Sequence, residues 1–412
     1  MSRFKFLGYK FDGKNAEFLY EGQDGLVFTE RVEFYEGKDY DKTALENALK
    51  FASIVLGTSY YKAHPTREVE LSFLLDETQA EFFTKIYQEG LSQYAFENGL
   101  TREDLAEFKA EQGLKVEQKG EDSGASLLSE NVSENVSEND KVLVLLSGGK
   151  DSLLSAEKIR ESGAEFRVCY ITGQQGYPKI LDDFRDFGAP VIIRRKIDVD
   201  NLKKAGGLNG HVPVTLINEA LALVQAILFG YNRVELGVGR EGLEPHAFIG
   251  DLPVNHQWSK TEQAQDLLKK YIRNYISHDV FVGSVLGNKN ELEIAKEFAE
   301  KCWDKYGEMF SSCNKANYKQ GANNSGLKWC GECAKCANSY LLFAPFVDCE
   351  KQLKIFGRDL FEDLRMAEIF KGLLGVDGVM KPFECIASID ELRWAYHHRL
   401  NGYGKLPFAV PE

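Results

Sequence analysis

The sequence contains no run approaching the roughly 20 consecutive apolar residues that a membrane-spanning helix requires. Its first residues, Met1-Ser2-Arg3-Phe4-Lys5, lead into an alternating pattern, whereas a secretory signal would have an apolar core. We therefore expect a cytoplasmic protein with no membrane segment. Because thiols stay reduced in the cytoplasm, the 8 cysteines predict free thiols or metal ligands and not disulfides.

Positively charged residues are fewer than negatively charged ones in this chain. Lys and Arg number 50 against 63 Asp and Glu, which gives a formal net charge of −13. The basic runs Lys203-Lys204 and Arg194-Arg195-Lys196 are short and typical of solvated faces. Since nucleic-acid surfaces are built from clustered Lys and Arg, we expect no nucleic-acid partner.

The length of 412 residues exceeds that of one ordinary domain, and the patterning changes along the chain. The repeated Ser-Glu-Asn-Val segment near residue 130 is polar, acidic and without aromatics, so it predicts a disordered linker. We divide the chain into an N-terminal α+β domain, this linker, an α/β domain and a helical, cysteine-rich region, at residues 1–115, 116–140, 141–300 and 301–412.

The N-terminal domain begins with alternation of apolar and polar residues over 4–35, which predicts an antiparallel meander. Helical periodicity follows over 43–56 and 78–96. A third helix is expected to begin at Thr101, because Thr101-Arg102-Glu103-Asp104 offers an N-cap and an acidic first turn.

From Lys141 onward, strand and helix patterns alternate. The apolar runs predict strands, and helices are expected between them; the strands fall at 142–146, 166–171, 191–194 and 233–238, and the helices at 153–162 and 216–229. This alternation predicts a parallel sheet covered by helices on both faces. Because ligands bind at the carboxyl ends of such strands, Ser147–Ser152, Thr172-Gly173 and Gly237–Glu241 are expected along one rim.

The hexapeptide after the first of these strands is a phosphate-binding pattern. Small residues in Ser147-Gly148-Gly149-Lys150-Asp151-Ser152 let the backbone approach an anion, and the first turn of the following helix directs N–H groups and a positive dipole at it. This residue pattern differs from that of the phosphate-binding loop of kinases and GTPases. It resembles the Ser-Gly-Gly-x-Asp-Ser loop of the ATP pyrophosphatase (PP-loop) superfamily, whose members cleave ATP between the α and β phosphates and adenylate a substrate.

A cysteine cluster lies in the C-terminal region. Cys330, Cys333 and Cys336 form two overlapping Cys-x2-Cys units, which leave a fourth ligand to come from elsewhere, and Cys313 is the expected one. Four thiolates suit a closed structural Zn²⁺ site that contributes folding energy. The spacing alone does not separate zinc from an iron–sulfur cluster, or from reduced cysteines without a metal.

Two irregular segments carry candidate acid–base groups. His211 lies in a glycine-rich stretch before a long helix, and Asp251, His256 and Lys260 lie in a polar stretch after the fourth strand. Loops positioned by a rigid sheet often carry function, although a lone histidine is more often structural. We favour His211 and His256 for proton transfer, with Asp251 and Lys260 as alternatives.

Several segments together resemble the UDP-N-acetylmuramoyl-L-alanyl-L-glutamate epimerase family of peptidoglycan precursor synthesis. They run over most of the chain outside the linker, and Asn-Gly-His-Val-Pro-Val and Asn-His-Gln-Trp-Ser-Lys are the ones that point to this family. The segments are Phe6–Tyr20, Gly148–Ser152, Asn209–Thr215, Asp251, Val254–Lys260, Glu291–Ala295, Ser312–Lys315, Trp329–Cys336 and Lys381–Cys385.

The resemblance implies a fold and a reaction. The fold would be a parallel-sheet PP-loop ATP pyrophosphatase (adenine nucleotide α-hydrolase-like) core with a small N-terminal α+β domain. The reaction would convert the terminal L-Glu of UDP-MurNAc-L-Ala-L-Glu to D-Glu, with Mg²⁺ and with ATP going to AMP and pyrophosphate. Ser147, Gly148, Gly149 and Ser152 would bind phosphates, Lys150 would offset charge on pyrophosphate, and Asp151 would hold Mg²⁺.

Two other functions remain open from the sequence. An ATP pyrophosphatase of this type could adenylate a tRNA base or a deazapurine, although the net charge of −13 disfavours RNA. A protein that only binds or senses ATP is the other, and the intact Asp151 and Ser152 disfavour it. The sequence does not indicate the oligomeric state.

Overall fold

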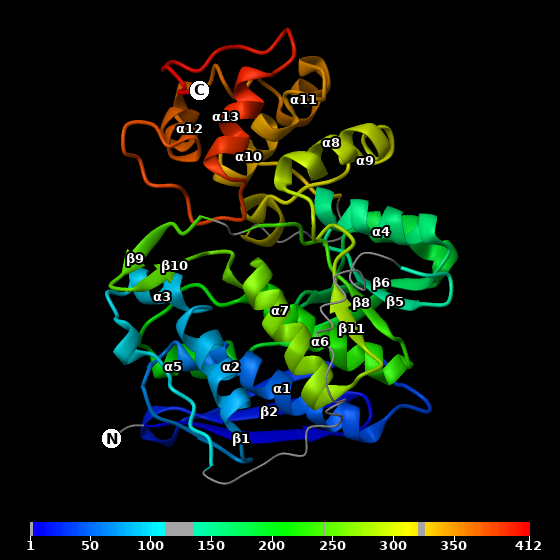
Figure 1. The fold of residues 1–412 in the computed structure, drawn as a ribbon, viewed down its shortest axis with the longest axis vertical. Coiled ribbons are helices and arrows are strands. Elements are labelled where there is room, and N and C mark those ends of the chain that lie inside the picture. The colour runs from blue at the N-terminus through cyan, green and yellow to red at the C-terminus, as the bar shows by residue number, and fades with distance from the viewer. Residues whose placement is uncertain (1–2, 112–135, 242–243, 320–325) are drawn as a thin grey trace, which may run out of the picture.

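The computed structural model describes residues 3–111, 136–241, 244–319 and 326–412 (Figure 1). Most of the predicted linker at 116–140 lies outside these ranges. Where the description resumes, a turn leads into the next strand, and in it the Ser137 N–H donates to Asp140 Oδ2 at 2.8 Å. None of the described helices combines the length and apolar character of a membrane span.

The described strands form one nine-stranded sheet, in the order β11-β8-β5-β6-β7-β3-β2-β1-β4, and a separate β9–β10 hairpin. Their bounds are β1 (Phe4–Phe11), β2 (Asn15–Glu21), β3 (Val27–Glu33), β4 (Val69–Leu71), β5 (Lys141–Leu145), β6 (Glu165–Thr172), β7 (Val191–Lys196), β8 (Arg233–Glu235), β9 (Ala247–Ile249), β10 (Leu252–Val254) and β11 (Phe281–Gly283).

Helices cover both faces of the large sheet. The α-helices are α1 (Lys42–Tyr61), α2 (Glu77–Gln88), α3 (Ser92–Glu97), α4 (Lys150–Ser162), α5 (Val199–Ala205), α6 (Val214–Phe229), α7 (Glu262–Tyr271), α8 (Glu291–Lys301), α9 (Trp303–Tyr306), α10 (Ala334–Phe343), α11 (Cys349–Phe356), α12 (Ala367–Leu374) and α13 (Ile389–His397). Short 3₁₀ or π turns lie at Gln23–Gly25, Arg102–Asp104, Lys179–Phe187, Trp258–Lys260, Ile272–Ile276, Lys315–Lys319 and Leu364–Met366.

The N-terminal meander and the parallel strands belong to the same sheet. β1, β2 and β3 pair antiparallel as the alternation predicts, and β3 then pairs antiparallel with β7, with Val32 opposite Arg195. Beyond β7, the strands β6, β5, β8 and β11 are all parallel. The sheet therefore runs continuously from the N-terminal segment into the α/β segment, and the sheet is mixed but mostly parallel.

Strand alternation builds two cores, one on each face of the sheet. On β5, Leu143 faces the core shared with α1 and α6, while its neighbours Val142 and Val144 face the core shared with α4, α8 and α10. In Figure 1, β1 and β2 lie at the bottom of the view and the C-terminal helices α10 to α13 lie at the top. The second core therefore ties the cysteine-rich region to the same parallel strands.

The prediction of one continuous helix at 78–96 is wrong. The structure divides it into α2 and α3, with a break at 89–91 around Gly90, a residue with low helix propensity. The strand predicted at 233–238 ends early, at Glu235, and β11 was not predicted from the sequence.

The predicted third helix is also wrong. Thr101 does begin a helical turn and forms a capping box with Asp104, with the Thr101 N–H donating to Asp104 Oδ2 at 2.8 Å. However, only a 3₁₀ turn follows, because Leu105 is already extended and the Glu107 N–H donates to Arg67 O at 3.0 Å. Pairing with a distant segment thus uses backbone hydrogen-bonding groups that a continued helix would have needed.

The junction of meander and parallel sheet contains a buried ion pair. Arg195 on β7 places Nε 2.5 Å from Glu30 Oε1 on β3, and the Glu30 side chain is fully buried. We expect Arg195→Met to lower the free energy of unfolding by about 3 to 5 kcal/mol, because it leaves a buried carboxylate without its partner. Chemical denaturation measures this change.

A matched control is Arg31→Met, which removes the exposed pair with Glu17 on the same part of the sheet and should cost less than about 1 kcal/mol. Equal effects of the two substitutions would contradict the assigned role of the junction pair.

Candidate active site

The parallel strands reverse their order beside β5. β6 and β7 follow β5 in the chain and lie on one side of it, while β8 returns to the other side after α6 has crossed the opposite face. Such a switch point leaves a crevice at the carboxyl ends of the two central strands, where α/β proteins bind ligands. The hexapeptide Ser147–Ser152 follows β5, and Gly237 follows β8.

The hexapeptide forms a tight turn at this crevice. Gly148 has φ +89°, a left-handed conformation that favours glycine. The Gly148 N–H and the Ser147 hydroxyl lie 3.3 and 3.4 Å from Ser152 Oγ, and α4 begins at Lys150. A Cβ built on Gly237 would lie 2.5 Å from Ser152 N, so the loop after β8 packs directly on the start of α4. The geometry brings backbone N–H groups and a helix N-terminus to the carboxyl edge of the sheet, which suits a phosphate.

Lys150 does not point freely into this crevice. Its Nζ lies 2.5 Å from Asp151 Oδ1 and 2.6 Å from Glu291 Oε2 at the start of α8. Burial alone would lower the pKa of Lys150, but these two carboxylates outweigh burial and raise it. Burial raises the pKa of Glu291 despite Lys150, and the nearby Asp151 and Glu241 carboxylates raise it further.

A second buried pair lies beside the first. Glu241, in the segment after β8, accepts at Oε2 from Lys260 Nζ and from Gln257 Nε2, each at 2.8 Å. The crevice thus gathers three carboxylates, those of Asp151, Glu241 and Glu291, around the ammonium groups of Lys150 and Lys260.

His211 and His256 come together near these charges. Their ring centroids are 4.4 Å apart, although they are 45 positions apart in the sequence. Burial lowers the pKa of His211 to about 3, and the neighbouring His256 and Lys62 add to this lowering. Burial likewise lowers the pKa of His256 to about 4. Both imidazoles are therefore neutral at pH 7.

Two lysines connect the loop with the histidine pair. Burial raises the pKa of Asp151, but the charges of Lys150, Lys260 and Lys335 outweigh it and lower the pKa. The charges of Lys335 and Lys260 also lower the pKa of His256. Lys260 and Lys335 therefore lie within the range of charge interactions of both the hexapeptide and His256.

Asp251 occupies a different environment from the other candidates. It lies in the turn between β9 and β10, its side chain is 85% exposed, and its Oδ2 pairs with Arg102 Nη2 at 3.3 Å. No described contact of the hairpin turn brings Asp251 to the histidine pair.

The C-terminal strap 381–385 closes one side of the site. His246 stacks on Phe383 with ring centroids 4.8 Å apart, and its Nε2 lies 3.1 Å from Pro382 O. Glu384 accepts from Asn314 Nδ2 at 3.1 Å, next to Cys313. The strap therefore connects the histidines with the cysteine cluster.

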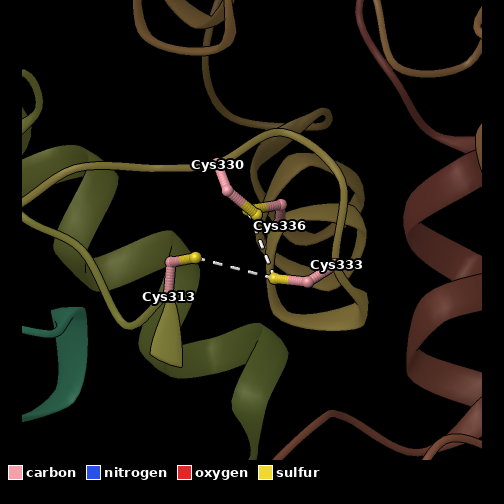
Figure 2. A group of neighbouring side chains, drawn as sticks. All are labelled: Cys313, Cys330, Cys333 and Cys336. Atoms are coloured by element: carbon pink, nitrogen blue, oxygen red, sulfur yellow. Dashed lines mark hydrogen bonds between the residues drawn. The ribbon is translucent and has the colours of Figure 1, made fainter. Parts of the chain in front are cut away.

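The four cysteines form one group (Figure 2). The Sγ atoms of Cys313, Cys330, Cys333 and Cys336 all lie within 4.8 Å of one another and face a common centre. The separations are 3.6 Å for Cys313–Cys333 and 3.5 Å for Cys333–Cys336. Zinc bound tetrahedrally by four thiolates would hold its sulfurs about 3.8 Å apart. The structure brings Cys313 together with the two Cys-x2-Cys units, and the group could hold a metal such as zinc.

Glu241 was expected on the rim of the sheet, and Glu291 and Lys335 lie in the family-like segments, but the sequence assigned none of them a role. Nothing in the sequence singled out Gln93 in α3, whose Oε1 lies 2.6 Å from His256 Nδ1. Glu241 carried a usable signal, because it follows a strand at the predicted rim. Lys335 lies between two of the clustered cysteines in the sequence, where the motif drew attention to the thiols alone.

The fold and site define a mixed α/β protein with a glycine loop at its switch point and a four-thiol cluster in its C-terminal part. Comparison with family models identifies its family. Residues 1–284 match the MurL N-terminal domain, and residues 309–402 match the MurL C-terminal domain. The chain belongs to the MurL family.

Three relatives share this similarity, and each is named UDP-N-acetyl-alpha-D-muramoyl-L-alanyl-L-glutamate epimerase. The protein of Micromonospora sp. is 32% identical over 403 residues, which cover 95% of this chain and 85% of the relative. That of Xanthomonas oryzae pv. oryzae is 31% identical, covering 86% and 74%. That of Salinispora tropica is 30% identical, covering 95% and 83%.

The thiol cluster leads to a test of metal content. The purified protein is expected to carry one tightly bound metal per chain, and Cys336→Ser should lose it and lower the melting temperature, because such a metal contributes folding energy. Elemental mass spectrometry measures the content, and visible absorbance separates an iron–sulfur cluster from zinc. Cys349→Ala, at a buried cysteine outside the cluster, is the control and should keep the metal. A metal-free wild-type protein would contradict this expectation.

The buried histidines lead to a pH dependence of stability. The pKa of His256 falls from its ordinary 6.5 to about 4 on folding, so the unfolded chain binds the extra proton between these values. Stability is therefore complete above about pH 6.5 and declines as the pH falls toward 4, by on the order of 3 kcal/mol from this residue.

Denaturation curves between pH 4 and 7 measure this slope. His256→Gln should flatten it, while His398→Gln, at an exposed histidine of the C-terminal region, should leave it unchanged. An unaltered slope in the His256 variant would refute the buried neutral imidazole.

Proposed function

We propose that this chain is an ATP- and Mg²⁺-dependent epimerase that converts the terminal L-Glu of UDP-MurNAc-L-Ala-L-Glu to D-Glu, releasing AMP and pyrophosphate. Membership of the MurL family and the names of the three relatives support the substrate. The observation that carries the mechanism is geometric. Lys260, four residues after His256, pairs with Glu241 at 2.8 Å, in the segment after β8 that packs on the first turn of α4. A phosphate loop and a pair of neutral bases then act on one substrate.

The chemistry explains why an epimerase would use ATP. Removing the Cα proton beside a free carboxylate would build a second negative charge next to the first. In the proposed reaction a carboxylate oxygen of the glutamate attacks the α phosphorus, and pyrophosphate leaves. The resulting acyl-adenylate has lost the carboxylate charge, and its carbonyl can accept the electron pair when the Cα proton is removed. A proton returned on the opposite face, followed by hydrolysis, gives D-Glu and AMP.

The proposed ATP site is the Ser147–Ser152 loop, as in the PP-loop superfamily. Backbone N–H groups of Gly148 and Gly149, with the hydroxyls of Ser147 and Ser152, would hold the leaving phosphates. Lys150 would offset their charge. Its ammonium is held beside the loop by its contacts with Asp151 and Glu291.

The carboxylates of the crevice fit a magnesium ion. Asp151, Glu241 and Glu291 offer the oxygen ligands that Mg²⁺ prefers. Burial raises the pKa of Glu291, and the neighbouring Asp151 and Glu241 carboxylates raise it further, so a cation beside them would relieve this repulsion. We assign Asp151 as a ligand, with Glu291 beside it. When bound, Mg²⁺ would stabilise negative charge on the phosphates of ATP.

His211 and His256 are the proposed proton carriers. Their lowered pKa values keep them neutral, so either imidazole could take the Cα proton, and the two rings lie together with centroids 4.4 Å apart. Lys260 is committed to Glu241, and Asp251 is exposed and paired with Arg102. These partners favour the histidines over the two alternatives.

The direct test is to incubate the protein with ATP, Mg²⁺ and UDP-MurNAc-L-Ala-L-Glu and to measure D-Glu and AMP together. We expect both products, and no D-Glu without ATP. AMP formed without any dependence on the muramoyl dipeptide would point instead to a nucleotide-binding protein that slowly hydrolyses ATP. Stimulation of pyrophosphate release by tRNA would point to an RNA-modifying enzyme.

Asp151 provides the matching variant. Asp151→Asn should lower AMP release by at least about 100-fold while the protein still folds, because the loop loses charge stabilisation of several kcal/mol. Asp183→Asn, at an exposed carboxylate after β6, is the control. Undiminished AMP release from Asp151→Asn would sink the assignment.

A further inference from the structure

The imidazole of His256 rests on a helix from the N-terminal part of the chain. Its Nδ1 lies 2.6 Å from Oε1 of Gln93 in α3, and the Gln93 side chain belongs to a residue that is only 6% exposed. The neighbouring Asn255 N–H donates to Ser92 Oγ, also in α3, at 3.1 Å. The loop that carries His256 is therefore attached to α3 by one backbone contact and one side-chain contact.

The same helix supports the loop that carries His211. Asn98, which ends α3, donates from Nδ2 to Asn209 O at 3.0 Å. Lys62, at the end of α1, donates to Gly210 O at 3.2 Å. Both histidine loops are thus positioned by residues from the first hundred positions, far from the hexapeptide in sequence.

The orientation of the Gln93 amide is fixed by a second partner. Gln93 Nε2 donates to Glu97 Oε1 at 2.7 Å, one helical turn further along α3. An ionised carboxylate only accepts hydrogen bonds, so the amide must direct its NH₂ to Glu97 and its oxygen to His256. An amide oxygen also only accepts, so the proton of the His256–Gln93 bond resides on Nδ1.

We infer that Gln93, held by Glu97, is a positioning residue that fixes His256 as the Nδ1–H tautomer and leaves Nε2 as its proton-accepting nitrogen. The inference rests on the proposed function, since it assigns which nitrogen takes the Cα proton. Among the described residues, no hydrogen bond is made by Nε2, which leaves that nitrogen open to a substrate. The carboxamide adds no charge, so the imidazole stays neutral, with Nε2 as its unprotonated nitrogen.

Other charges around His256 would govern its titration. Lys335 and Lys260 disfavour the imidazolium, while Glu384 and Glu97 favour it, and burial has the largest effect. The rings of His211 and His246 also face it, with centroids 4.4 and 6.5 Å away. Gln93→Met removes none of these charged groups, and among the described contacts the Gln93 side chain bonds only to Glu97 and His256. An altered pH profile in this variant can therefore be traced to the Glu97–Gln93–His256 contacts.

The test that needs no activity is the tautomer itself. In histidine-labelled full-length protein at pH 7, long-range ¹H–¹⁵N correlation spectra distinguish Nδ1–H from Nε2–H, and His256→Gln assigns the signal. We expect the Nδ1–H form in the wild type and in Gln93→Glu, which keeps an acceptor oxygen. Gln93→Met, similar in size but without that acceptor, should show a mixture or the Nε2–H form. The Nε2–H form in the wild type would overturn the inference.

A matched control removes an equally buried glutamine elsewhere. Gln88 on α2 is 8% exposed and bonds to Ala106 O and to Arg102, away from the histidines. Gln88→Met should leave the His256 tautomer as in the wild type. If it changed the tautomer as much as Gln93→Met does, the effect would be general loosening of the fold and the inference would fail.

The catalytic readout separates the two half-reactions. Gln93→Met should keep substrate-dependent exchange of pyrophosphate into ATP within about twofold, and should lower solvent deuterium incorporation at the glutamate Cα by at least about tenfold. Gln93→Glu should restore part of the deuterium incorporation and move its acidic limb to higher pH, because a carboxylate stabilises imidazolium. Equal loss of both half-reactions in Gln93→Met would overturn the positioning role.

The outcomes also separate this inference from the proposed function. If the wild type neither forms D-Glu nor incorporates deuterium, the proposed function fails, whatever the tautomer. If the wild type is active and Gln93→Met incorporates deuterium at the wild-type rate, the proposed function stands and the positioning role of Gln93 is wrong.

Discussion

The site depends on the close approach of two loops at the switch point of the sheet. The chain after β8 passes so near to the first turn of α4 that a Cβ on Gly237 would lie 2.5 Å from Ser152 N. This contact holds the loop after β5 against the segment that leads to Glu241, and Lys150 of the same turn pairs with Glu291 at the start of α8 at 2.6 Å. Charged groups from three separate segments thereby share a small buried volume, where each one is strongly influenced by the others.

Distant parts of the chain complete what the parallel sheet begins. The N-terminal segment supplies α3 beneath both histidine loops, and the C-terminal strap 381–385 covers His246. The cysteine cluster lies in the same region, and Lys335, between two of its members, influences both Asp151 and His256. A metal bound by the thiols would therefore hold the peptide that carries this ammonium group, which connects a structural element with the charge balance of the site.

Local chemistry predicted a large part of this arrangement. The hexapeptide after β5, the meander and the alternating strands and helices follow from short-range patterns, and Cys313 was expected because four thiolates suit a closed site. The helix expected at Thr101 was wrong because Glu107 bonds to the distant Arg67. Gln93 could not be predicted for the same reason: its partner lies 163 positions away, and nothing in its own surroundings in the sequence indicates a histidine.

The central claim is that the nucleotide loop activates the glutamate before the histidines exchange its Cα proton. The most direct measurement is incorporation of solvent deuterium at that carbon in ²H₂O, compared between ATP and α,β-methylene-ATP, which resists cleavage between the α and β phosphates. The account predicts deuterium at Cα with ATP and none above background with the analogue. Equal incorporation with both nucleotides would show that proton exchange does not need adenylation and would contradict the account.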